Sequence, residues 1–163
     1  MNAPESYAPT DLSGPSADPG QEAERFVAAS AALTGFDAAE LAETEMAGIY
    51  REFVVRRVAP SLYAELVERL VGTPDDAHTA LGGDEADEAL GELARAVCHL
   101  WYLGEWPGLT SDDGGPQPRL LSGRAYARGL VWRSLGAHAP GAGRPGYGTW
   151  AGPPAGAAGG GVR

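Results

Sequence analysis

"DEALGELARAVCHLWYLG", residues 87–104, carries a strong helical pattern. Asp84 and Asp87 stand at its start as candidate N-caps, and Gly104 follows its end as a residue suited to terminate a helix. The large apolar residues recur every three or four positions, which predicts an amphipathic helix with one buried face. They are Leu90, Leu93, Ala94, Val97, Leu100 and Trp101.

A second boundary is equally well marked upstream. Asp37 and Glu40 have the spacing of a capping box, in which each side chain bonds the backbone N–H of the other. Phe36 and Leu41 flank them as a hydrophobic staple. We expect one helix from this cap to Pro60, because apolar residues continue along one face. They are Met46, Ile49, Tyr50, Phe53, Val54 and Val58.

The rest of the middle region is also helical in pattern. Residues 21–35 and 62–70 are amphipathic at helical spacing, and Ser122 begins a last helix that ends at Gly136. Residues 73–84 are expected to form a loop. No segment alternates with period two over a useful length, so a sheet is not expected. The sequence therefore predicts an all-α fold, a small bundle of about four to five helices.

The two ends differ from the middle in composition. Residues 1–20 have four prolines and no periodicity, and are expected to be a disordered leader; residues 21–136 form the bundle domain. Residues 137–163 form an extended tail rich in Gly, Pro and Trp. Ordering that tail costs about 1–2 kcal/mol per residue, and its few large side chains bury too little area to offset the cost. The tail must therefore stay mobile or lie on another surface.

Charge and cysteine content restrict the function classes. The net charge is −10, all acidic residues lie at or before Asp113, and residues 119–163 contain six arginines and no acid. An acidic chain without lysine is a poor candidate for nucleic-acid binding. The single cysteine, Cys98, excludes an internal disulfide. No apolar run approaches the roughly 20 residues of a membrane span.

Motifs for catalysis, cofactors and metals are weak. Gly141, Gly143 and Gly146 have the spacing G-x-G-x-x-G, but a helix and not a strand precedes them, so they do not predict a dinucleotide site. Cys98-His99 is half of a haem attachment motif, and a buried thiol explains it better. The three histidines have no paired metal-ligand spacing. We expect no catalytic, cofactor-binding or metal-binding residues on this chain.

Aromatic residues near the C-terminus are the more informative feature. All four tryptophans fall within the last 63 residues, in or beside expected loops. Core packing explains Trp101 and also suits Trp132, whereas Trp106, beside Pro107, and Trp150 are expected to need another surface. That surface belongs either to a partner protein or to the chain's own bundle.

Three stretches give a resemblance to a known family. "ALTGFDAAEL" at 32–41, "WYLGEW" at 101–106 and "AYARGLVWRSLGAHAPGAGRPGYGTWAGPP" at 125–154 resemble the small subunit of bacterial membrane-bound FAD-dependent sugar and sugar-alcohol dehydrogenase complexes, of the sorbitol, fructose and glucose dehydrogenase type. The resemblance spans roughly residues 24–154. Ala139 departs from it, since the similar proteins usually have a second proline there.

The resemblance implies an accessory role without catalytic residues. In such complexes a large subunit carries FAD and oxidises the sugar, while the small subunit supports its folding, stability or export. Iron–sulfur and haem groups can belong to partner subunits, and a cytochrome c subunit can be among them. The residues expected to contact the partner are Trp101, Tyr102, Trp106, Tyr126, Arg128, Trp132, Arg133, His138, Arg144, Tyr147 and Trp150. A free-standing helical interaction module is the alternative function.

The expected location differs between the two lines of reasoning. The first 20 residues have neither a basic n-region nor an apolar h-region, so no export signal is expected and the chain as it stands would remain in the cytoplasm. The resemblance instead implies a periplasmic or membrane-associated complex, whose small subunits typically carry a twin-arginine signal.

Overall fold

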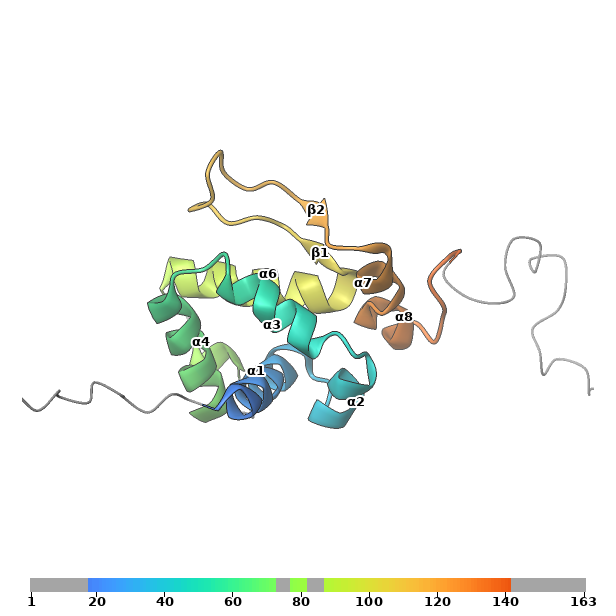
Figure 1. Ribbon diagram of the computed structural model, residues 1–163, viewed down its shortest axis with the longest axis horizontal. Helices are drawn as coiled ribbons and strands as arrows, with labels where there is room; N and C mark the ends of the chain where they lie inside the picture. Colours follow the sequence, from blue (N-terminus) through green and yellow to red (C-terminus); the bar gives the residue numbers. More distant parts are fainter. Residues whose placement is uncertain (1–17, 73–76, 82–86, 142–163) are drawn as a thin grey trace, which may run out of the picture.

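The computed structural model describes residues 18–72, 77–81 and 87–141 (Figure 1). The fold of these residues is all-α, as the sequence predicts, apart from one very small sheet that it does not predict. The expected disordered leader and extended tail lie mainly outside the described residues. In chain order the elements are α1 (Pro19–Thr34), α2 (Ala38–Glu43), α3 (Ala47–Val55), α4 (Pro60–Gly72), α5 (Ala77–Ala80), α6 (Glu88–Leu103), β1 (Glu105–Trp106), β2 (Arg119–Leu120), α7 (Gly123–Ala127) and α8 (Leu130–Ser134).

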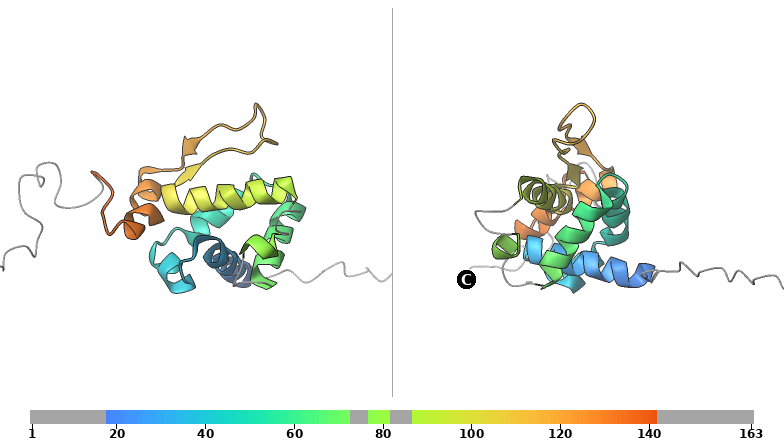
Figure 2. Two further views of the ribbon diagram at one scale, coloured as in Figure 1. Left: turned by 180° about the vertical axis from the view of Figure 1, so that it is seen from behind. Right: turned by 90° about the vertical axis from the view of Figure 1, so that its left-hand side faces the viewer.

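Helix α6 is the centre of the fold, which confirms the prediction from its apolar pattern. It contacts α1, α3, α4, α8 and β1, and runs across the molecule between α1 and the segment that carries the two strands (Figures 1 and 2). The Asp87 side chain accepts the N–H of Ala89 at 2.9 Å and caps its start, and Gly104 ends it in the left-handed conformation. Its buried residues are Leu90, Leu93, Ala94, Ala96, Val97, Leu100 and Trp101.

The helix expected from Asp37 to Pro60 is in fact two helices. The capping box at its start is confirmed: the Asp37 carboxylate accepts the Glu40 N–H at 2.8 Å, and the Glu40 carboxylate accepts the Asp37 N–H at 3.0 Å. The chain then leaves the helix after Glu43, and Glu45 adopts a left-handed φ of 57°. Glycine and asparagine favour that conformation, and glutamate does not, so the sequence gives no warning of the break.

Three further expectations need correction. The expected loop at 73–84 contains the short helix α5. The expected last helix is divided into α7 and α8, because Gly129 turns the chain where its backbone approaches the carbonyl oxygen of Tyr102. A sheet does form: β1 and β2 pair antiparallel, with Glu105 opposite Leu120 and Trp106 opposite Arg119. Two-residue strands are too short to leave a period-two pattern in the sequence.

Residues 105–120, the hairpin arm, extend from the end of α6 and return to α7 (Figure 1). Trp106 and Leu109, both within the arm, are buried. Thr110 anchors it to α6, because its N–H and its hydroxyl both donate to the Glu92 carboxylate, at 2.8 and 2.7 Å. The contact of Thr110 with Glu92 thus fixes part of the hairpin arm to α6, although the sequence of the arm suggests only a polar connection.

The described chain ends beside α8, at the opposite side of the molecule from α4 (Figure 1). The first residues of the expected tail still belong to the folded part: Ala137 donates its N–H to the Trp132 carbonyl at 2.8 Å, and Ala139 is buried. Within the described ranges, none of the helices is long and apolar enough to cross a membrane.

Candidate functional site

The three stretches that carry the family resemblance meet at one end of the bundle. We call this meeting point, formed by residues 32–41, 101–106 and 125–139, the three-segment junction. The Tyr102 hydroxyl donates to the Thr34 carbonyl at 2.8 Å, and the Tyr102 ring packs edge-on against Phe36 at 6.2 Å between centroids. The first two stretches are therefore joined by one aromatic residue that is only half-buried.

Glycine allows the second and third stretches to approach each other. A Cβ added at Gly104 would lie 2.4 Å from the carbonyl carbon of Ala125, and Gly104 has a φ of +68°. A Cβ at Gly129 would lie 2.5 Å from the carbonyl oxygen of Tyr102. Real Cβ atoms do not come this close to backbone, so both positions need glycine for α7 and α8 to rest against the end of α6.

Within the third stretch, Tyr126 and Trp132 pack on each other. Their rings meet edge-on at 5.3 Å, and the Trp132 indole N–H donates to the Tyr126 carbonyl at 2.8 Å. Both side chains remain partly accessible. Leu130 between them is fully buried, so it anchors this aromatic pair to the core.

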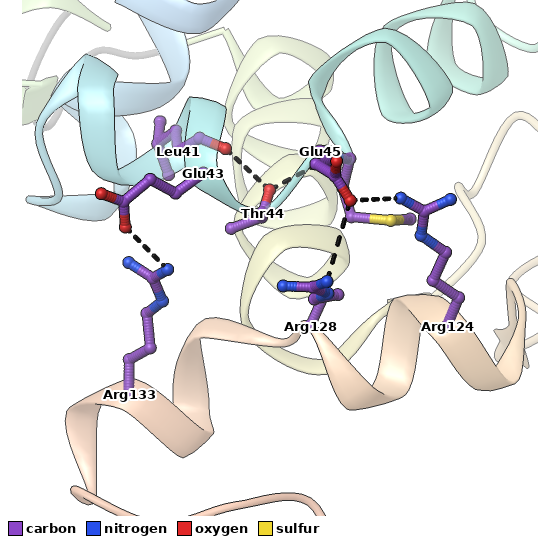
Figure 3. Close-up of polar contacts among 8 residues, drawn as sticks. Leu41, Glu43, Thr44, Glu45, Arg124, Arg128 and Arg133 are labelled. Atoms are coloured by element: carbon purple, nitrogen blue, oxygen red, sulfur yellow. Dashed lines mark hydrogen bonds and ion pairs between the residues drawn. The ribbon is translucent and has the colours of Figure 1, made fainter. Parts of the chain in front are cut away.

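Ion pairs connect the third stretch to the break between α2 and α3 (Figure 3). Glu45 accepts from Arg124 at 2.8 Å and lies 3.7 Å from Arg128, while Glu43 accepts from Arg133 at 3.0 Å. All five side chains are substantially exposed to solvent. Exposed pairs contribute about 0–1 kcal/mol each, so this cluster adds little stability. Three guanidinium groups facing two carboxylates leave the surface locally basic.

Thr44 holds the backbone that presents these two carboxylates. Its hydroxyl donates to the Leu41 carbonyl at 2.7 Å and accepts the Met46 N–H at 3.2 Å (Figure 3). Thr44 is itself buried, so the break between the helices is a fixed part of the fold. Glu43 and Glu45 project on either side of it toward α7 and α8.

Two of the expected partner contacts are core residues, which corrects their interpretation. Trp101 and Trp106 are each only 1% exposed. Trp101 packs against Phe26 and Tyr50, and Trp106 packs edge-on against Phe53 at 5.4 Å. Trp106 belongs to the hairpin arm, and its ring packs on Phe53 of α3, so the bundle itself supplies the surface that this indole needs. Neither indole can reach a partner in this conformation.

The other expected contacts lie at the three-segment junction or beyond the described chain. Tyr102, Tyr126 and Trp132 are half-buried there. Exposed residues of the third stretch are Arg128, Arg133 and His138, with the apolar Leu135 at 68% exposure. The remaining three lie outside the described residues, as do most of the glycines of the G-x-G-x-x-G spacing; the three are Arg144, Tyr147 and Trp150.

The chemistry of the junction suits binding. Cys98 donates its thiol to the Leu33 carbonyl at 3.6 Å, and burial raises the pKa of the Cys98 thiol, which disfavours the reactive thiolate. Over residues 18–72, 77–81 and 87–141, no group of three or more His, Cys, Asp or Glu side chains could hold a metal ion. What the junction offers is a surface of half-buried aromatic rings, arginines and one exposed leucine.

Sequence reasoning missed a groove beside the junction. It is lined by Ile49, Glu52, Phe53, Arg56, Arg57 and Leu121, from α3 and from the segment between β2 and α7. The helical pattern assigned Ile49 and Phe53 to the core, yet Ile49 is 42% exposed and Phe53 is only partly buried. No local signal could have shown this, because the other wall comes from a distant part of the chain.

No family model matches this chain, and neither a curated protein nor a solved structure is significantly similar to it. The assignment of a function therefore depends on the resemblance of the three stretches and on the surface just described.

Proposed function

We propose that this chain is a non-catalytic accessory subunit of a FAD-dependent sugar or polyol dehydrogenase. It binds the catalytic large subunit and supports its folding, stability or export. FAD belongs to the large subunit in this proposal, and any iron–sulfur or haem group belongs to other partner chains.

One observation carries the proposal. The described parts of the three stretches, residues 32–41, 101–106 and 125–141, are far apart in the sequence but pack together at one end of the bundle, as Tyr102 with Thr34 and Gly104 with Ala125 illustrate. This packing supports the proposal because it gathers the resembling residues into one region of the fold.

The exposed side chains of this region suit a protein partner. Arginine and aromatic residues are enriched where interfaces derive most of their binding energy, and the region presents both. Leu135 adds an apolar side chain at 68% exposure. The sequence continues into residues 142–163, which include Tyr147 and Trp150, two further aromatic residues of the kind that is enriched at interfaces.

Co-expression tests the proposal. The flavoprotein encoded in the adjacent reading frame is produced with and without this chain, and soluble protein, bound flavin and sugar oxidation with an artificial electron acceptor are measured. We expect this chain to raise the yield of FAD-loaded enzyme. A variant with Tyr147→Ala and Trp150→Ala should lose most of the gain, while Val71→Ala, at an exposed position on α4, should retain it.

Three results would count against this function. Equal yield and activity without the chain would contradict the accessory role. Adjacent reading frames that encode no flavoprotein, together with capture of unrelated partners, would favour the free-standing interaction module. Sugar oxidation by the purified chain alone would contradict its non-catalytic character.

A further inference from the structure

The groove beside the junction is an open depression with a volume of about 500 Å³. Its apolar surface comes from Ile49 and Phe53 on α3 and from Leu121 opposite them. Ile49 is 42% exposed, which is high for a large aliphatic residue beside two other apolar side chains. The groove is therefore wide enough and apolar enough to take a side chain from another molecule.

The floor of the groove is held in place from beneath. Phe53 meets the ring of Trp106 edge-on at 5.4 Å, and Trp106 is itself buried. The Arg57 guanidinium lies over the Phe53 ring, 4.5 Å from its centroid. A preformed surface loses little conformational entropy on binding, which favours affinity. Trp106 thus supports a binding surface without touching the ligand.

The rim of the groove is basic, although the chain as a whole carries a net charge of −10. Arg56 is paired with Glu52, its neighbour one turn away. Arg57, in contrast, has no ion pair with any described residue, and neither does Arg119. Arg119 is exposed and lies two residues before Leu121, which lines the groove.

From this juxtaposition we infer that the groove binds an acidic segment of the partner protein. One apolar side chain of that segment occupies the space between Ile49, Phe53 and Leu121, and a neighbouring carboxylate binds the guanidinium of Arg57. Arginine suits this role because its planar donors bind a carboxylate through two parallel hydrogen bonds. The inference rests on the proposed function, since it takes the partner to be the catalytic flavoprotein.

Charge reversal provides the first test. The FAD-loaded catalytic subunit is titrated with the full-length chain, and the Kd is compared for wild type, Arg57→Glu and Arg57→Gln. We expect Arg57→Glu to raise the Kd about tenfold or more and Arg57→Gln to raise it less. Arg95→Glu is the matched control, because Arg95 is exposed on α6, lacks an ion pair among the described residues and lies outside the groove.

Photo-crosslinking provides a second readout that does not depend on affinity. Ile49→p-benzoylphenylalanine should crosslink to the flavoprotein, and mass spectrometry should locate the product in a segment containing Asp or Glu. Val71→p-benzoylphenylalanine, at a position of similar exposure on α4, should give little product.

The outcomes separate the two proposals. If the wild-type chain binds the flavoprotein, but Arg57→Glu binds as tightly as Arg95→Glu and position 49 does not crosslink, the groove proposal is wrong and the accessory role stands. If position 49 crosslinks to a segment without acidic residues, the stated chemistry of the ligand is wrong. If the wild-type chain does not bind the flavoprotein at all, both proposals are refuted.

Discussion

Substitution of Gly104 by alanine tests whether close backbone packing holds the three-segment junction together. Gly104 has a φ of +68°, and an added Cβ would meet the Ala125 carbonyl carbon at 2.4 Å. The change therefore has two costs. The left-handed conformation costs a non-glycine residue about 1–2 kcal/mol, which the stiffer unfolded chain offsets only in part. Overpacking against backbone adds about 1–3 kcal/mol.

Gly35→Ala separates the two costs. Gly35 has a nearly equal φ of +75° at the end of α1, but nothing lies within 4 Å of its added Cβ. We expect Gly35→Ala to lower the free energy of unfolding by about 1 kcal/mol. Gly104→Ala should lower it by about 2–4 kcal/mol, because it adds the clash. For a chain of this length the larger change corresponds to a fall in Tm of about 5–15 °C.

Urea denaturation followed by tryptophan fluorescence measures both variants. Equal destabilisation by Gly35→Ala and Gly104→Ala would refute the reasoning, since only the contact with α7 distinguishes them. Gly129→Ala provides an independent check: its φ of −56° suits alanine, but its Cβ would lie 2.5 Å from the Tyr102 carbonyl oxygen. It should destabilise through the clash alone.

Three further predictions concern single side chains. Asp37→Ala removes the capping box of α2 and should cost about 1 kcal/mol of unfolding free energy, measured by urea denaturation. Glu45→Gln removes the negative charge that faces Arg124 and Arg128 and should cost at most about 1 kcal/mol, a cost that falls toward zero in high salt. Glu45→Gly should be close to neutral, because it also relieves the left-handed φ of 57°. Burial raises the pKa of Tyr50 above its usual value of 10.0. Above about pH 10 the tyrosine therefore ionises in the unfolded chain before it does so in the folded chain, and the free energy of unfolding falls as the pH rises. Tyr50→Phe should lessen that fall in a series of urea unfolding curves from about pH 8 to 11.

Features encoded by neighbouring residues could be predicted from the sequence. The capping box at Asp37 and Glu40 and the limits of α6 depend on residues within a few positions of each other. Their signals are local hydrogen bonds and the 3.6-residue period, which do not depend on the rest of the chain. These are the parts of the fold that the structure confirms.

Features set by contacts between distant residues could not be predicted. The helix breaks at Glu45 although neither Glu45 nor its direct neighbours Thr44 and Met46 is proline or glycine, and the Glu45 carboxylate contacts Arg124, which lies 79 positions further along the chain. From the sequence, Trp106 between Glu105 and Pro107 is expected to need another surface, either a partner's or that of the chain's own bundle. The structure supplies the second, because the Trp106 ring packs on Phe53, which lies far earlier in the chain. No window of sequence contains both ends of these interactions.

The packing of the three-segment junction shows which of its residues can serve to test for partner binding. Tyr102, Gly104 and Gly129 resemble the family, but packing within this chain already accounts for each of them. Any protein with this fold would need them, whether or not it binds a flavoprotein. Leu135 and His138, in the third stretch, are exposed, so packing within the described chain does not explain why these two residues stand there. Substitutions at these two positions should therefore leave the free energy of unfolding unchanged and weaken the complex, whereas a shared fold without a shared partner predicts no effect on either.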